Sequence, residues 1–107
     1  MDYVKVEIFI PEDRVITLAN ALNDHGYLTQ GFYDYAFSTS KVIGRWRPLE
    51  GANPYDGKIG VVSEEEETKM EFRLRAEDVK EAVKLIRSLH PYETPVINVI
   101  ALIDPED

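Results

Sequence analysis

The side chains best suited to chemistry stand together near the end of the chain, in the tetrapeptide His90-Pro91-Tyr92-Glu93. It offers an imidazole, a phenol and a carboxylate on a segment that proline makes rigid. Imidazole and carboxylate groups bind divalent transition metals, but one His and one Glu supply at most half of a usual site. A metal site through His90 and Glu93 therefore requires His25, another carboxylate or a second copy of the chain. The alternative is a structural turn, in which Pro91 ends a helix, His90 meets the helix carbonyl groups and Tyr92 anchors the turn.

A second group of candidates is the run Gly44-Arg45-Trp46-Arg47. Trp46 stands between two guanidinium groups, a combination that stacks on bases, holds phosphates or docks on a neighbouring subunit. The chain has 12 Lys and Arg residues against 20 Asp and Glu residues, so its formal net charge is −8. That charge opposes nucleic acids and anionic membranes as partners, so interface packing is favoured over nucleotide or anion binding. The predicted ligand or partner site consists of Gly44, Arg45, Trp46, Arg47, His90, Tyr92 and Glu93.

No familiar catalytic motif accompanies these residues. The sequence lacks a Gly-rich phosphate loop, a serine elbow and a paired-histidine zinc helix, and it has no cysteine. We therefore expect no enzyme, and the alternative is acid–base catalysis by His90 and Glu93, because imidazole titrates near neutrality. The run Glu64–Glu67 lacks the Asp, Asn and Gly spacing of a calcium loop, so a solvated turn is expected there.

Hydrophobic periodicity predicts the elements that position these groups. The expected elements are a strand at Tyr3–Ile10, a helix from Glu12 to Gly26, a strand at Tyr27–Thr39, a long Gly- and Pro-rich loop over about 41–60, a strand at Lys69–Arg75, a helix from Glu77 to about His90, a strand at Val96–Ile103 and an acidic tail over 104–107. This order predicts a single α+β domain over residues 1–107 with a ferredoxin-like (βαββαβ) sandwich. Its four-stranded antiparallel sheet would carry two helices on one face.

The last predicted strand is apolar on both of its faces. In the usual order for this topology it lies at a sheet edge, where the face toward solvent should be polar. Ile100 would lie on one face and Ile97 and Val99 on the other, so both faces favour burial. We therefore predict a homo-oligomer in which a second copy covers this strand. The alternative is that the long loop folds back over it.

The sequence also bears on localisation. Met1 is followed by Asp2 rather than by a basic stretch, so no targeting signal is recognised. The longest apolar run, Val96–Ile103, contains Asn98 and is too short to cross a bilayer. A cytoplasmic protein without a membrane partner is expected.

The region from Gly44 to Val99 resembles a known domain. The matching features are Gly44-Arg45-Trp46-Arg47-Pro48-Leu49-Glu50-Gly51-Ala52-Asn53-Pro54, then Gly57 and Gly60, a strand with Glu71 and Arg73, and Leu89-His90-Pro91-Tyr92-Glu93. Together they resemble the domain inserted in the middle of Nif-three-like (NGG-one-interacting factor three) proteins, which is PII-like and similar to CutA in fold. The chain departs from that pattern at Lys41-Val42-Ile43, where a second glycine is usual, and in its acidic run Glu64–Glu67.

The resemblance implies a PII/CutA-like fold that assembles through sheet faces and loops, with a trimer favoured, and it brings no enzyme. We therefore expect an oligomeric cytoplasmic binding or regulatory module. Its only expected cofactor is a divalent transition metal at the His-Pro-Tyr-Glu turn, if that turn binds metal rather than serving as structure. The alternative function is a structural assembly domain without a small ligand, which recruits a separate protein.

Overall fold

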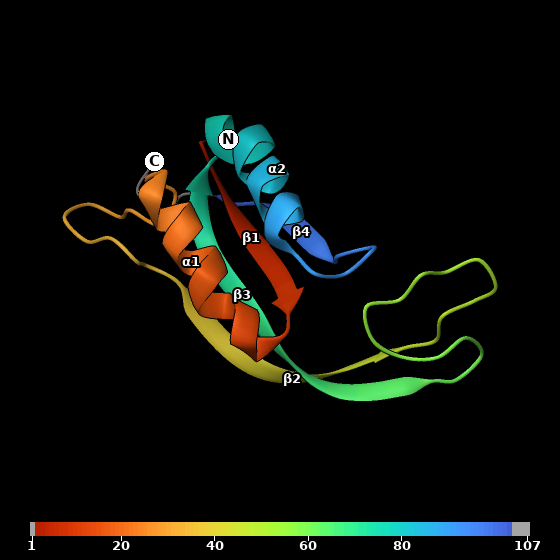
Figure 1. The fold of residues 1–107 in the computed structure, drawn as a ribbon. Coiled ribbons are helices and arrows are strands. Elements are labelled where there is room, and N and C mark those ends of the chain that lie inside the picture. Colours follow the sequence, from red (N-terminus) through yellow and green to blue (C-terminus); the bar gives the residue numbers. More distant parts are fainter. Residues whose placement is uncertain (1, 104–107) are drawn as a thin grey trace.

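The computed structural model describes residues 2–103, so the predicted acidic tail lies outside the described residues. Its elements are β1 (Tyr3–Ile10), a 3-10 turn (Glu12–Arg14), α1 (Val15–Asp24), β2 (Ser38–Trp46), β3 (Ser63–Arg75), a second 3-10 turn (Ala76–Asp78), α2 (Val79–Leu89) and β4 (Ile97–Ala101). The strands form one sheet in the order β2-β3-β1-β4, and every neighbouring pair is antiparallel. Both helices cover the same face of this sheet (Figure 1). The predicted ferredoxin-like α+β sandwich is confirmed.

The core lies between the sheet and the helices because apolar residues recur at the period of each element. Along β1, buried and half-buried positions alternate strictly, so that Val6 and Ile8 enter the core while their neighbours face the other side. Leu18 and Leu22 of α1 lie one turn apart and meet this layer, as does Ile86 of α2. Burial on a single face leaves the opposite face of the sheet uncovered by helices.

The ends of both helices follow from local sequence, as predicted. Gly26 takes a positive φ of 78° just beyond α1, a conformation that suits glycine. His90 is extended after α2, with ψ at 132°, because Pro91 disfavours helical geometry at the preceding residue. The helices α1 and α2 run in opposite directions (Figure 1). His25 and His90, which directly follow these helices, therefore lie at opposite ends of the helical layer.

The predicted second strand at Tyr27–Thr39 is wrong, because β2 begins at Ser38. Phe32 and Tyr33 of the predicted strand lie in a tight turn instead, where Phe32 is fully exposed. The predicted loop over 41–60 is also wrong in its first part: residues 41–46 belong to β2, and the loop covers 47–62. This strand was not recognised in the sequence because it contains Lys41 and Arg45, and charged residues are typical of loops.

The predicted turn at Glu64–Glu67 is likewise wrong, because these residues lie in the first half of β3. They pair with β2, and Lys41 and Arg45 neutralise two of them: Lys41 Nζ lies 3.4 Å from Glu66 Oε1, and Arg45 Nη2 lies 3.3 Å from Glu64 Oε1. Opposite charges facing each other across strands offset the repulsion among consecutive glutamates. The β2–β3 pair thereby continues as a two-stranded ribbon beyond the rest of the sheet (Figure 1).

β4 lies at the sheet edge, as predicted, although it is shorter than the expected Val96–Ile103. Val99 is 42% exposed and Ile100 is 41% exposed, on opposite faces of the strand. The long loop therefore does not cover β4, against the alternative considered from the sequence. Within residues 2–103, no helix combines the length and apolar character needed to cross a membrane.

Candidate functional site: an aromatic cavity on the open face of the sheet

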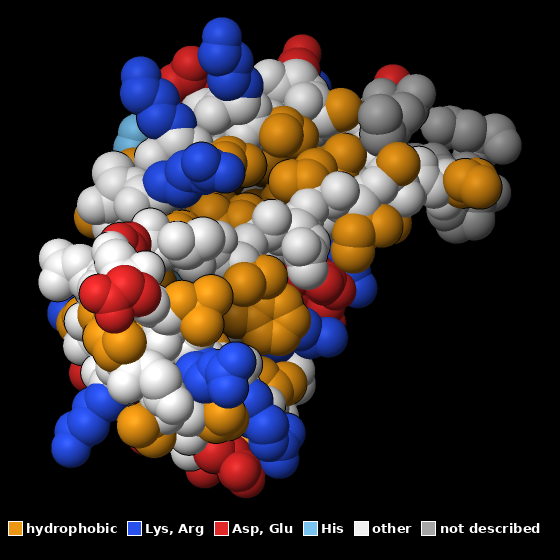
Figure 2. All heavy atoms as spheres, turned by 90° about the vertical axis from the view of Figure 1, so that its right-hand side faces the viewer, with side chains coloured by type: hydrophobic (Ala, Val, Ile, Leu, Met, Phe, Trp, Pro, Cys, Tyr) orange, Lys and Arg blue, Asp and Glu red, His pale blue; other side chains and the backbone are white. Residues whose placement is uncertain are grey.

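A cavity of ≈ 570 Å³ lies between the β2–β3 ribbon, the loop over 47–62 and the turn after α2. Its lining residues are Phe9, Gly44, Arg45, Trp46, Arg47, Pro48, Leu49, Ala52, Pro54, Tyr55, Asp56, Glu67, Tyr92, Glu93, Thr94 and Val96. Figure 2 views the molecule from this end and shows hydrophobic side chains gathered in the middle with Lys and Arg side chains around them. A mostly apolar concavity of this size is typical of binding sites.

Three aromatic rings form the walls of the cavity. Tyr92 stands at the centre, with its ring centroid 6.2 Å from that of Trp46 and 5.9 Å from that of Tyr55. Trp46 is held by its indole N–H, which donates to the carbonyl oxygen of Asp56 at 3.3 Å. The Arg14 guanidinium lies 5.9 Å from the centre of the Tyr55 ring, which is within the range of a cation–π contact. The rings thus come from β2, the long loop and the turn after α2.

A buried carboxylate forms part of the cavity lining. Glu67 is only 7% exposed, and its Oε2 accepts a hydrogen bond of 2.9 Å from the Tyr92 hydroxyl. Its other oxygen, Oε1, occupies the space where a side chain on Gly44 would begin. Gly44 is therefore required because the carboxylate packs directly on its backbone. Burial and the hydrogen bond to Glu67 raise the pKa of Tyr92, so the phenol stays protonated as the donor.

His90 lies behind Tyr92 rather than in the cavity wall, with the two ring centroids 4.9 Å apart. The Tyr92 backbone N–H donates to His90 Nδ1 at 3.1 Å. Because Nδ1 accepts, Nε2 carries the proton and donates to the carbonyl oxygen of Phe9 at 2.7 Å. Burial lowers the pKa of His90 and outweighs the opposing hydrogen bond to Phe9. The imidazole therefore fastens the turn to the end of β1 as a neutral group.

Two further contacts shape the rim of the cavity. The Asn53 backbone N–H donates to Glu93 Oε2 at 3.1 Å, which ties the long loop to the turn after α2. Arg45 is paired with Glu64 on the neighbouring strand. Arg47 is exposed and makes no ion pair within residues 2–103. The rim thus retains one available guanidinium group.

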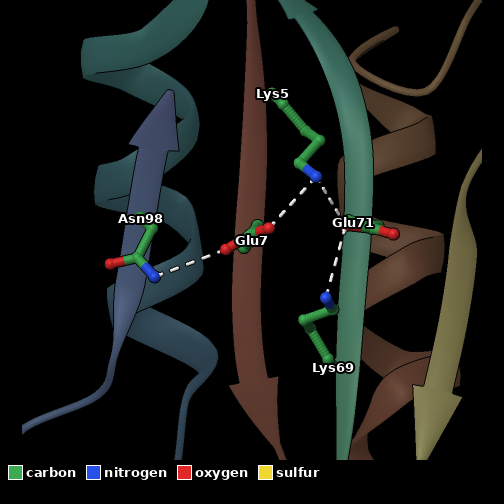
Figure 3. A network of polar contacts seen from close by, with 5 residues as sticks. All are labelled: Lys5, Glu7, Lys69, Glu71 and Asn98. Carbon is green, nitrogen blue, oxygen red and sulfur yellow. Dashed lines mark hydrogen bonds and ion pairs between the residues drawn. The ribbon is translucent and has the colours of Figure 1, made fainter. Parts of the chain in front are cut away.

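Beyond the cavity, the open face of the sheet carries a network of charges (Figure 3). Lys5 Nζ lies 3.1 Å from Glu7 Oε2 and 3.1 Å from Glu71 Oε2, so it bridges two carboxylates that face each other on β1 and β3. Lys69 Nζ lies 3.9 Å from Glu71, and the Asn98 amide donates to Glu7 at 3.4 Å. The hydrogen bonds to Glu71 and Glu7 raise the pKa of Lys5, while the bond from Lys5 lowers the pKa of Glu7.

The structure brings the two predicted groups of site residues together at one cavity. Gly44, Arg45, Trp46, Arg47, Tyr92 and Glu93 line it, and His90 supports it from behind. Sequence reasoning missed Glu67, which was hidden among four consecutive glutamates, and Tyr55, which was one residue in a long loop. Glu67 can be identified as a site residue once the pairing of β2 with β3 is known. Val42 lies directly opposite Glu67, and the nearby Gly44 leaves space for its carboxylate.

The geometry also bears on metal binding. Within residues 2–103, His, Asp and Glu side chains form no cluster of three or more that would hold a metal ion. Both nitrogens of His90 are engaged in hydrogen bonds, and His25 lies at the other end of the molecule with its Nδ1 2.9 Å from the carbonyl oxygen of Ala21. The described residues of one chain, 2–103, therefore do not fit a complete metal site at this turn.

Comparisons with known proteins agree with this fold. The family described as CutA1 divalent ion tolerance protein matches residues 55–106. The "GTP cyclohydrolase 1 type 2 homolog" of Staphylococcus aureus is 37% identical over 100 residues, which cover 94% of this chain but only 27% of that protein. The chain thus spans about a quarter of the length of the curated relatives that it matches.

Solved structures give the same picture. A Bacillus cereus protein related to NIF3 superposes with a TM-score of 0.82 at 26% identity, over 96% of this chain and 26% of that one. The periplasmic divalent cation tolerance protein CutA from Archaeoglobus fulgidus superposes with a TM-score of 0.71 at 17% identity, over 94% of this chain and 83% of that one, and shows the fold alone. The resemblance predicted from the motifs is confirmed: the chain has a CutA-like fold and is similar in sequence and structure to a part of NIF3-related proteins.

Proposed function

We propose that this chain is a small cytoplasmic binding or regulatory module that assembles into homo-oligomers and uses the aromatic cavity as its ligand or partner site. The observation that carries the proposal is the junction at Tyr92, which packs against Trp46 and Tyr55 and donates to the buried Glu67. Apolar walls with a few fixed polar groups favour binding over chemistry. His90 is engaged through both nitrogens and buried, which argues against a role in proton transfer.

A fluorescent probe tests whether the cavity binds. Anilinonaphthalene sulfonate combines flat apolar rings, which suit the aromatic walls, with an anionic group, which suits Arg47 at the rim. We expect it to bind the dilute protein and to quench or shift the emission of Trp46, the one tryptophan in the chain. Trp46→Ala and Tyr92→Ala should each weaken binding of the dye, whereas Ile16→Ala on the exposed side of α1 should not. Equal binding by all of these proteins would contradict the proposal.

Metal binding through His90 and Glu93 is a subsidiary proposal. It requires His90 to give up one of its two hydrogen bonds and a second copy of the chain to supply the remaining ligands. Calorimetric titration of the wild-type protein with Zn²⁺, Ni²⁺ and Cu²⁺ tests it, with His25→Gln as the control variant. We expect the heat of metal binding to disappear in His90→Gln and to persist in His25→Gln. Absence of binding heat in the wild type would contradict the proposal.

A structural assembly domain is the second candidate, and the exposed apolar residues of β4 favour it. Such a domain would recruit a separate protein through its surface without any small ligand. A pull-down that survives His90→Ala and fails with Trp46→Ala, in a protein that does not bind the dye, would support this function over the first. The cyclohydrolase name belongs to relatives of which the matched segment is only 27%, so we do not propose that activity for this chain.

A further inference from the structure

The turn between α1 and β2 presents large apolar side chains to solvent. Phe32 is 104% exposed and Tyr33 is 78% exposed. Gln30 and Tyr33 exchange both backbone hydrogen bonds, at 2.8 and 3.0 Å, so that Phe32 stands near the apex of a tight turn. We call residues 30–35 the aromatic turn. A large apolar side chain that is held in contact with water does not stabilise the single chain. Such exposure is typical of interaction sites.

Hydrogen bonds from α1 hold the aromatic turn in a demanding conformation. Tyr35 has a φ of 50°, a left-handed conformation that bulky residues rarely adopt. Its backbone N–H donates to Asn23 Oδ1 at 2.8 Å, and its hydroxyl donates to Asn20 Oδ1 at 2.9 Å. The Asn23 amide in turn donates to Asp34 at 3.1 Å. Strain that the surroundings impose in this way gathers in functional segments.

The aromatic cavity complements this turn in polarity. Its lining includes Asp56, Glu67 and Glu93, so the charge complement to the turn is local and comes from Arg47 at the rim. The cavity walls are largely apolar and include the rings of Trp46, Tyr55 and Tyr92, and Arg47 at the rim makes no ion pair within residues 2–103. The aromatic turn carries Asp34, and the sequence has no Lys or Arg between residues 26 and 40. The turn and the cavity lie at opposite ends of a molecule 48 Å long (Figure 1). A chain therefore cannot insert this turn into its own cavity, whereas two copies arranged head to tail can meet in this way.

We propose that the aromatic turn of one copy inserts Phe32 and Tyr33 into the cavity of the next copy, with Asp34 beside Arg47 of the partner subunit. This inference rests on the proposed role of the cavity as a binding site and names its occupant as a second copy of this chain. The contact joins two different surfaces, so it forms a closed ring if the rotation between copies closes and an open chain if it does not.

Mixing two variants tests the contact directly. Phe32→Ala keeps the cavity and the single tryptophan but loses the inserted ring. Trp46→Ala keeps the aromatic turn and is invisible to tryptophan fluorescence. When Trp46→Ala is titrated into Phe32→Ala, the Trp46 emission should move to shorter wavelength as the donor's Phe32 excludes water from the cavity. Trp46→Phe is a second donor, in case Trp46→Ala does not fold.

The matched control donor is the double variant Phe32→Ala with Trp46→Ala, which should leave the emission unchanged. Arg47→Glu in the acceptor should weaken the titration several-fold, and Asp34→Lys in the donor should restore it. No shift with either donor, or an equal shift with the control donor, overturns the inference. If the dye binds Phe32→Ala while the donors produce no shift, the cavity remains a binding site with a different occupant. If neither binds, both proposals fail.

Discussion

Tyr92 connects three parts of the chain through one side chain: its ring packs against Trp46 and Tyr55, and its hydroxyl satisfies the buried Glu67. A buried acceptor that loses its donor keeps the cost of its desolvation, which is larger than the net value of an ordinary hydrogen bond. The other oxygen of this carboxylate, Oε1, rests on the Gly44 backbone, so the carboxylate has little room to turn toward another donor.

We therefore expect Tyr92→Phe to lower the free energy of unfolding by roughly 1–3 kcal/mol, because it leaves Glu67 without this donor. Tyr55→Phe is the matched control, since Tyr55 belongs to the same wall and its hydroxyl makes no hydrogen bond within residues 2–103. Urea denaturation followed by circular dichroism measures both values. Equal stability of the two variants would show that the hydrogen bond to Glu67 is not what holds the turn in place.

The lowered pKa of His90 predicts that the free energy of unfolding depends on pH. Burial lowers its pKa in the folded protein below the ordinary value of 6.5, so the unfolded chain takes up this proton at a higher pH than the folded chain does. The contribution of neutral His90 is thus fully present above pH 6.5 and is lost as the pH falls from 6.5 through the lowered folded-state pKa. Unfolding measured between pH 7 and about pH 5 should show a shallower slope for His90→Gln than for the wild type. A wild-type slope in His90→Gln would contradict the role of His90.

At the scale of elements, the open face of the sheet depends on Lys5, which lies between Glu7 on β1 and Glu71 on β3. These two carboxylates are direct cross-strand partners, and like charges in that position are destabilising. Lys5→Met should therefore destabilise the protein more than Lys80→Met on the exposed side of α2, and adding Glu71→Gln to Lys5→Met should recover part of the loss. Thermal unfolding of these variants and of Glu71→Gln alone, at low salt, measures the effect. Additive effects of Lys5→Met and Glu71→Gln would contradict the bridge.

The elements also show how far sequence reasoning extends. The order of strands and helices, both helix ends and the edge position of β4 were predictable, because Pro91, Gly26 and the alternation along β1 act locally. The position of β2 was not, because exposed ribbon strands have no buried face and show no apolar period at Lys41 or Arg45. The convergence of Trp46 and Tyr92 at one cavity was suggested only by resemblance, since strand pairing and loop folding, rather than spacing, bring them together.

At the scale of the whole molecule, the chain exposes more surface than its size requires. Its accessible surface is 7223 Å² at 12.3 kDa, whereas a compact monomer of this mass exposes roughly 6,100 Å². Its radius of gyration is 15.1 Å, against about 13 Å for a compact chain of this length. The excess comes from the β2–β3 ribbon and the long loop, which extend away from the core (Figure 1). Standard interfaces bury about 800 Å² per partner, so the excess is of the size that one interface would cover.

The exposed edge strand gives this argument its test. Ile100 lies on the open face of β4, and a lysine there would have to be buried if another copy covers that face. We expect the wild-type protein to sediment as an oligomer at micromolar concentration and Ile100→Lys to shift it toward the monomer. Ile16→Lys on the exposed side of α1 adds the same charge in place of another solvent-exposed isoleucine and should leave the oligomer intact. Since Lys5 lies directly opposite Ile100 on β1, Ile100→Glu should dissociate the oligomer less than Ile100→Lys does. A monomeric wild type, or equal dissociation by the Ile16 and Ile100 variants, would remove β4 as an interface between copies.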